Sequence, residues 1–369
     1  MKLDERVIAS ICVWVSFLGV IALSPAVVAQ ADADDITGGF AYPNPSVTAV
    51  DDLTAVEINP AGLSLVDGGE FAYGLGLESP LGDDKFNTEH SVLLSGGTGD
   101  FGGGLALQWL RGEFGGRTIS YHKHSLGLGF KPANMFSVGT SLHLFGSSES
   151  RALDKLATWD VGFQFRPTSF LGVGFTARSI NQPFLTSFDS IPMTLHPGLA
   201  FRLLDGRIVL DGTLAWNTGT DQTDVRPRFS VEPIPGLNLF ARADIPLGSS
   251  GDEAFKETRF SGGLAVNFGH VGLRSSAESE HHARSMQFTR HTHLVRTTTQ
   301  RETSLIPHGR RWVRATIDDS LAERSESPLF GPERRSILKT VETFRQMSDD
   351  PEIDGVVLDI QPNDLGYAQ

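Results

Sequence analysis

Apolar and small or polar residues alternate along the chain between about residues 69 and 293. In the clearest stretch, residues 158–165, every second side chain is apolar: Trp159, Val161, Phe163 and Phe165. The same alternation occurs in residues 136–145, 171–178, 208–216 and 260–268. A period of two with one apolar face predicts β-strands that are half-buried in an apolar environment. A protein core and a lipid bilayer both provide such an environment.

The connections between these stretches alternate between short and long. We expect short ones at residues 96–99, 132–134, 167–169, 205–206, 233–236 and 269–270, and long ones at 81–88, 147–155, 181–191, 217–224, 248–257 and 275–283. Outer-membrane barrels have short periplasmic turns and longer external loops, and their closed sheet leaves no unpaired edge in lipid. We therefore predict a mainly β fold, a barrel of about fourteen strands over residues 69–295. A soluble β-sandwich or a carbohydrate-binding module is the alternative.

The first residues have the pattern of an export signal. Lys2 and Arg6 precede an apolar run over residues 7–23, and Pro25 is followed by small residues that end in Ala29. A basic region, an apolar region and a small-residue cleavage site are the features of a signal peptide. We predict residues 1–29 as the signal peptide, with an uncleaved anchor helix as the alternative. Cleavage would also remove the only cysteine, Cys12, so we expect no disulfide in the exported chain.

A short motif precedes the first predicted strand. Residues 59–63 read Asn-Pro-Ala-Gly-Leu. This segment resembles the NPAGL signature of the FadL and PorV-like outer-membrane barrels, and the resemblance extends by architecture over residues 51–293. It implies a fourteen-stranded barrel behind a plug-like amino-terminal segment, and a protein that passes hydrophobic ligands or anchors partners. We assign residues 30–68 as a linker and plug-like segment.

The last part of the chain has a different pattern. Residues 311–317 predict a strand, Pro332 suits the first turn of a helix that ends before Pro351, and residues 353–360 form an apolar run typical of a buried parallel strand. Strand, helix and strand together predict an incomplete α/β (βαβ) segment. We assign residues 296–369 as a linker followed by this segment.

The carboxyl-terminal segment resembles the start of the SppA-type signal peptide peptidases, the protease IV family. The residues that carry the resemblance are 336–341, 349–360 and 365–369. The resemblance implies a Ser nucleophile and a Lys general base, both expected beyond this segment. Pro362 stands where the family has a glycine-containing oxyanion loop, and proline has no N–H to donate. Lys339 does not match the position of the catalytic lysine.

Two hypotheses about function follow. The first is an outer-membrane barrel that carries the beginning of a periplasmic SppA-like serine peptidase, with the catalytic residues not present in this chain. The alternative is a non-enzymatic outer-membrane barrel that transports hydrophobic ligands or anchors a protein. Whether the protein is an enzyme stays undecided between them. Membrane lipid is an expected partner in both, peptide substrates only in the first, and a homo-oligomer remains open.

Charge and composition narrow the class of partner. The chain of 369 residues has 31 basic and 44 acidic residues, so its formal net charge is 31 − 44 = −13. A nucleic-acid-binding protein needs a basic surface that displaces phosphate counterions, so we expect no nucleic-acid partner. The single cysteine excludes a multi-cysteine metal site.

Residues that resemble parts of catalytic or metal sites are given structural roles. Four serines without a nucleophile elbow are expected in loops: Ser147, Ser148, Ser275 and Ser276. Residues 102–104 are glycines without the lysine of a phosphate-binding loop, so we expect them on a barrel face. His122 and His124 share one strand face, which we expect to point toward a polar lumen. No carboxylate or thiolate completes a metal site with the remaining paired histidines, His281, His282, His291 and His293. We assign no catalytic, cofactor-binding or metal-binding residue.

Overall fold

The computed structural model describes most of the chain from Thr37 onward. The described residues are 37–78, 87–98, 100–114, 117–185, 190–219, 222–247, 258–282, 285–306, 312–317, 340–341, 343–345, 347, 353 and 355–360. The predicted signal peptide, Lys339, Pro332 and Pro362 lie outside these residues. The chain divides into two units, Met1–Leu305 and Ile306–Gln369.

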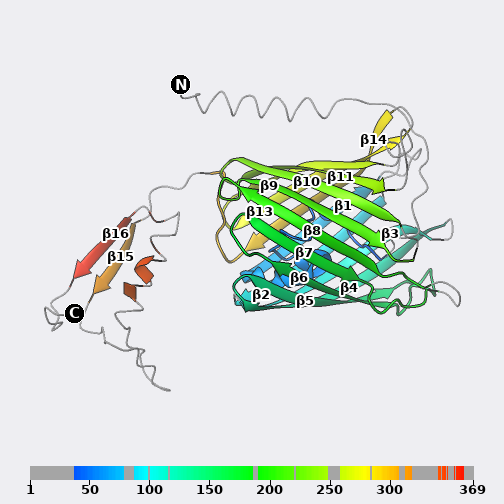
Figure 1. The fold of residues 1–369 in the computed structure, drawn as a ribbon, viewed down its shortest axis with the longest axis horizontal. Helices are drawn as coiled ribbons and strands as arrows, with labels where there is room; N and C mark the ends of the chain where they lie inside the picture. Colours follow the sequence, from blue (N-terminus) through cyan, green and yellow to red (C-terminus); the bar gives the residue numbers. More distant parts are fainter. Residues whose placement is uncertain are drawn as a thin grey trace, which may run out of the picture. The chain divides into compact units, whose positions relative to one another are not determined.

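The first unit is a closed antiparallel barrel of fourteen strands (Figure 1). Each strand pairs with its neighbours in sequence, and β1 also pairs with β14 to close the sheet. The strands are β1 (Asp67–Glu78), β2 (Asn87–Thr98), β3 (Phe101–Phe114), β4 (Arg117–Ala133), β5 (Phe136–Gly146), β6 (Ala157–Phe165), β7 (Leu171–Arg178), β8 (Thr194–Leu203), β9 (Ile208–Asn217), β10 (Thr223–Ile234), β11 (Leu237–Leu247), β12 (Arg259–Asn267), β13 (Val271–His282) and β14 (Ser285–Thr298). The predicted closed barrel and its number of strands are confirmed.

Side chains alternate between the inside and the outside of this barrel. In β6, Asp160, Gly162 and Gln164 are buried and face the lumen, whereas Trp159 and Val161 are exposed on the outside. The polar and small residues therefore line the interior, and the apolar residues cover the outer surface. This is the reverse of a water-soluble barrel and is typical of strands whose outer face contacts lipid.

The two ends of the barrel differ in their connections. At one end, here called the turn end, each pair of strands is joined by five residues or fewer, as between β10 and β11. The other end, the loop end, carries all the connections longer than five residues, as between β7 and β8, but only two residues separate β3 from β4 and β13 from β14 there. The first strand, β1, begins at the turn end, and the last strand, β14, ends there. The Thr299 amide, just after β14, donates to the Gly69 carbonyl near the start of β1 at 2.9 Å. The predicted long loop at residues 275–283 is wrong, since most of it belongs to β13.

The segment before β1 lies inside the barrel, where it appears blue between the strands in Figure 1. We call residues 37–66 the plug. It contains a short helix α2 (Ala55–Ile58) and a 3-10 helix η2 (Pro60–Leu65), and nearly all of residues 50–66 are buried. The plug supplies much of the buried apolar cluster, so the lumen is filled rather than open.

The second unit contains strands β15 (Trp312–Ile317) and β16 (Gly355–Ile360), which pair in parallel. The residues described between them, Thr340, Val341, Thr343, Phe344, Arg345 and Met347, are helical. The described residues thus contain a parallel strand pair and part of a helix, and the predicted βαβ segment of a peptidase domain is not shown. No helix among the described residues is long and apolar enough to cross a membrane.

Candidate functional site

The NPAGL residues form a buried turn of the plug against the inner wall of the barrel. Asn59 Nδ2 donates to the Val47 carbonyl at 2.7 Å and to the Phe163 carbonyl of β6 at 3.1 Å. Its Oδ1 accepts a hydrogen bond from the Ala61 amide at 3.2 Å. A buried amide whose donors and acceptor are all paired fixes the segment that carries it. Asn59 therefore holds two parts of the plug at one point on the wall.

A row of glycines in the wall makes room for this turn. The strand registers place these glycines side by side across five strands: Gly97, Gly102, Gly129, Gly139 and Gly162. A Cβ atom at Gly129 would lie 2.6 Å from the Ser64 amide nitrogen, and one at Gly139 would overlap the backbone of Pro60. The backbone of the plug thus rests directly on the backbone of the sheet, which only glycine permits.

A buried charged cluster connects helix α2 to strands β4, β5 and β6. Lys123 Nζ lies 2.7 Å from Glu57 Oε2, and both side chains are almost fully buried. His143 Nδ1 lies 2.7 Å from Ser125 Oγ, and its Nε2 lies 3.1 Å from Asp160 Oδ2. Burial alone would raise the pKa of Glu57, but the Coulombic effect of the neighbouring Lys123 and His143 holds the pKa below its ordinary value. Glu57 is therefore ionised and attached to the wall.

A second charged cluster lies where β14 meets β1. Arg274 of β13 contacts Asp52 Oδ2 at 2.6 Å, and Arg296 of β14 contacts the same oxygen at 3.7 Å. Arg296 also contacts Glu70 of β1 at 3.3 Å, and Glu70 Oε2 accepts the Leu53 amide at 2.7 Å. Burial opposes ionisation of Asp52, but the two guanidinium groups hold its pKa well below the ordinary value. The plug is thus bound to the last strands as well as to the first.

The inner wall near the loop end is apolar on the side of β3, β4 and β5. One buried cluster contains these inward side chains together with residues of the plug and of the β5–β6 loop: Leu110, Ile119, Tyr121, Phe145, Phe40, Tyr42, Leu153 and Leu156. We call this group the apolar cluster. Tyr42 gives it a polar boundary, because its hydroxyl lies 2.8 Å from Ser91 Oγ and accepts a hydrogen bond from Gln108 Nε2 at 3.1 Å. Burial, with Glu57 nearby, raises the pKa of Tyr42, so this phenol stays neutral.

A polar hollow lies between the plug and strands β7 to β11. Its volume is about 390 Å³, including the part that is open to solvent, and it is lined by Pro45, Ser46, Val47, Ile58, Arg178, His196, Asp211, Thr213, Arg226 and Arg242. Acidic residues neutralise much of its positive charge: Arg228 Nε lies 2.7 Å from Asp211, and Arg242 makes two hydrogen bonds of 2.6 Å to Asp244. The lumen therefore has an apolar side and a charged side with the plug between them.

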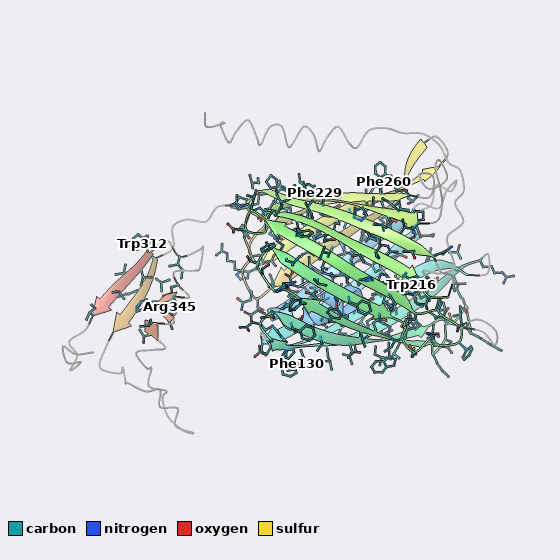
Figure 2. All side chains as sticks on the ribbon, in the orientation of Figure 1. Phe130, Trp216, Phe229, Phe260, Trp312 and Arg345 are labelled. Carbon is teal, nitrogen blue, oxygen red and sulfur yellow. The ribbon has the colours of Figure 1, made fainter. Side chains whose placement is uncertain are left out.

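The outer surface carries large apolar side chains around the barrel, including Phe130, Phe229 and Trp216 (Figure 2). Toward the loop end lie the tryptophans of the barrel, Trp109, Trp159 and Trp216, all at least 42% exposed. Phenylalanines such as Phe101 and Phe130, whose rings stack at 4.6 Å, lie toward the turn end. An apolar band bounded by aromatic side chains at both edges is the pattern that barrels present to a bilayer.

The predicted orientation of His122 and His124 is wrong. Both are exposed on the outer face of β4, in line with Leu126, Leu128 and Phe130, while Lys123 and its alternate neighbours face the lumen. In the sequence, Leu126 and Leu128 follow His124 at alternate positions, and these apolar residues on the same strand face were a signal that the face points outward. Polar histidines are found on the outer face here because they lie near the loop end of the strand, beyond the apolar band.

The other residues considered from the sequence have structural surroundings. Ser147 Oγ donates to the Ser120 carbonyl at 2.8 Å, and Ser275 Oγ lies 3.0 Å from His293 Nδ1. Residues 102–104 belong to β3, as expected for small residues on a barrel face. Among the residues whose placement is described, no group of three or more His, Cys, Asp or Glu side chains could hold a metal ion. The side chains of His281 and His282 lie outside the described part of the chain.

Comparison with known proteins supports the barrel and not the peptidase. No family model and no curated protein matches the chain. Among solved structures, the chain is similar to the Ralstonia pickettii toluene transporter TbuX, with a TM-score of 0.53 and 11% identity over 72% of this chain and 99% of that one. It is also similar to the Pseudomonas putida toluene transporter TodX (TM-score 0.50, 12% identity, 74% and 98% covered) and to the CymD monoaromatic hydrocarbon channel (0.51, 10%, 69% and 95%).

The chain therefore shares the fold of these solved barrels, and the fourteen-stranded barrel that the NPAGL motif implied is confirmed. At these identities the likeness establishes the fold alone. The interpretation as the front of an SppA-like peptidase is not confirmed: neither the family models nor the curated proteins provide support for it.

Proposed function

We propose that this protein is an outer-membrane channel that admits small hydrophobic compounds through a plugged lumen. The barrel would span the outer membrane with its turn end on the periplasmic side. The solved structures of similar fold include transporters of toluene and a channel for monoaromatic hydrocarbons, which supports this class of ligand.

The observation that carries the proposal is the apolar cluster at the loop end of the lumen. A channel for polar solutes needs a polar, water-filled interior. Here, Leu110, Ile119 and Phe145 face inward from the wall and pack with Phe40 of the plug in one apolar cluster. An apolar ligand can replace these contacts without leaving a polar group unpaired, whereas a sugar or an ion cannot.

The plug sets what the channel excludes. Residues 37–66 are attached to the wall by the Asn59, Glu57 and Asp52 contacts, and the glycine row brings the plug into backbone contact with the sheet. We therefore expect the channel to exclude hydrophilic solutes while it admits hydrocarbons.

Entry of toluene and of a sugar into cells that produce the protein tests the proposal. Cells with the wild-type chain should take up toluene faster than cells without it, and the sugar equally slowly. The Leu110→Asn variant, changed inside the apolar cluster, should reduce toluene entry several-fold at equal protein level. Leu105→Asn is the matched control because Leu105 lies on the outer face of the same strand. Equal entry of sugar and toluene would instead indicate a general pore.

The carboxyl-terminal unit supports a second proposal, that it begins an SppA-like α/β domain on the periplasmic side. The observation in its favour is the parallel register from Trp312 opposite Gly355 to Ile317 opposite Ile360, with helical residues between the strands. The DNA that follows the Gln369 codon tests it. An open frame that encodes a Ser/Lys pair would support the peptidase, whereas a stop codon would leave an anchoring role for this unit.

A further inference from the structure

A band of histidines lies on the outer surface of the barrel near the loop end. The strand registers place His293, Leu75, His90, Trp109 and His122 opposite one another in a continuous row across β14, β1, β2, β3 and β4. His291 and His124 lie on the same outer face, one step to either side of this row. All outward-facing histidines that the structure describes in the barrel strands belong to these five neighbouring strands.

The imidazoles of this band are held in place by their neighbours. The Tyr73 hydroxyl lies 2.8 Å from His90 Nδ1, and the Ser275 hydroxyl lies 3.0 Å from His293 Nδ1. When the hydroxyl donates to Nδ1, the neutral ring carries its proton on Nε2. His90 and His293 then each present an N–H donor on the outer surface, with or without a positive charge.

The surroundings of the band favour an anionic ligand. Arg111, which hydrogen-bonds Asn87 at 3.3 Å, adds a positive charge on the outer face of β3. The carboxylates of Glu78 and Glu89, at the same ends of β1 and β2, lie on the lumen face. Among the side chains described in the loop-end halves of these five strands, none on the outer face is a carboxylate, and Glu149 of the β5–β6 loop accepts the Ser120 amide of β4 at 2.9 Å. The histidine and arginine donors described on this face suit phosphate oxygens.

The height of the band on the barrel favours a lipid as the source of that phosphate. His122 precedes Phe130 on the outer face of β4 by eight residues, with the exposed Leu126 and Leu128 between them. Eight residues of a strand tilted by about 40° span roughly 20 Å along the bilayer normal, close to the height of about 25 Å of an apolar band. The histidines therefore lie at the level where head groups begin, directly above the surface that acyl chains cover.

We propose that the outer face of β14, β1, β2, β3 and β4 near the loop end binds the phosphorylated head group of a membrane lipid. The histidines donate hydrogen bonds to the phosphate, Trp109 lies among them at the interface, and the leucines below contact the acyl chains. This inference rests on the membrane location in the proposed function but not on the passage of any ligand through the lumen.

Retention of lipid A by the purified full chain in detergent, measured by native mass spectrometry, tests the proposal. The H90Q/H122Q/H293Q variant should bind diphosphoryl lipid A about tenfold more weakly than the wild type, because donors to phosphate are lost. His270→Gln is the matched control, since His270 is exposed at the turn end. Toluene entry should be unchanged in both variants, which separates this proposal from the channel function.

A second variant keeps the test informative if the triple variant does not fold. Thr88→Glu places a carboxylate on the exposed outer face two residues before His90 and should also weaken lipid A binding. The proposal would be overturned if a folded H90Q/H122Q/H293Q or Thr88→Glu variant bound lipid A as well as the wild type does. It would also be overturned if His270→Gln lost as much lipid A binding as they do. Displacement of lipid A by inorganic phosphate, or a dimer that only the wild type forms, would overturn it as well, in favour of free phosphate or a second copy of the chain.

Discussion

Individual glycines and charged residues, rather than large apolar side chains, determine how the plug fits the lumen. The glycine row brings two backbones into contact, and Lys123 and Glu57 form an ion pair that water barely reaches. Residues of both kinds were visible in the sequence, but their partners were not. Gly139 and Pro60 are brought together by strand register, and no local pattern encodes a contact between residues so far apart in the chain.

The Gly139→Ala variant should be destabilised by about 1–3 kcal/mol, because the added methyl group overlaps the backbone of Pro60 and neither backbone can move freely. Gly212→Ala is the matched control, since a Cβ atom at Gly212 would meet nothing within 4 Å. Urea unfolding of both variants in detergent measures the difference. Equal midpoints for the two variants would show that the plug does not rest on the wall at this row.

Replacing Lys123 by Met should cost about 3–5 kcal/mol of unfolding free energy, because Glu57 is left buried without its cation. The double variant K123M/E57Q should recover part of this loss, since it removes the stranded charge. Urea unfolding of the wild type, both single variants and the double variant gives the coupling energy. Strictly additive losses would contradict a direct interaction between the two residues.

At the scale of elements, the plug and the strands differ in what the sequence reveals about them. Alternating apolar residues predict the strands locally, so the fourteen-stranded barrel could be expected from the sequence. The face of each strand was harder to assign: the histidines of β4 were expected inside the lumen and lie outside. The plug has no repeating pattern, and only the NPAGL motif pointed to it, so its charged contacts to β4, β13 and β14 could not be predicted.

The attachment of the plug should weaken in acid. Glu57 and Asp52 have folded-state pKa values below their ordinary values, so the stability that they contribute is fully present above about pH 4.5 and is lost as the pH falls further. These two carboxylates should leave the urea midpoint unchanged between about pH 7 and 5. As the pH drops under about 4, their protonation should lower the urea midpoint.

The E57Q/D52N variant provides the control for this pH dependence. It lacks both titrating carboxylates, so it should be less stable at neutral pH but lose less stability between neutral pH and acid. Tryptophan fluorescence during urea unfolding at a series of pH values measures both chains. Parallel curves for the two chains would assign the acid sensitivity to other groups.

At the scale of the whole molecule, the barrel has apolar side chains on its outer surface and polar side chains in its lumen, which is the reverse of a water-soluble barrel. The sequence pattern left both lipid and a protein core as the apolar surroundings of the strands. The closed sheet, with side chains such as Leu126 and Leu128 more than half exposed, indicates lipid. The carboxyl-terminal unit adds a parallel strand pair whose apolar side chains Val357 and Leu358 are also exposed in the described structure.

Leu126→Arg should destabilise the protein in phosphatidylcholine vesicles by about 2–4 kcal/mol, because it places a charge near the middle of the apolar band. Leu204→Arg is the control: Leu204 is 69% exposed, but it lies in the β8–β9 turn, where water is accessible, and its cost should be about 0–1 kcal/mol. Urea unfolding from vesicles compares the two. Similar small costs at both positions would contradict a lipid-facing wall.

The pairing of β1 with β14 has a consequence for how the molecule is held together. The plug immediately precedes β1, and β14 is the last strand of the ring, so the plug begins beside the pair of strands that closes the barrel. Asp52 contacts arginines of β13 and β14, and the neighbouring Leu53 amide is bonded to Glu70 of β1. The amino-terminal segment therefore holds the edges of the final seam together from within. A chain that lacked this segment would lose these contacts across the closing pair of strands.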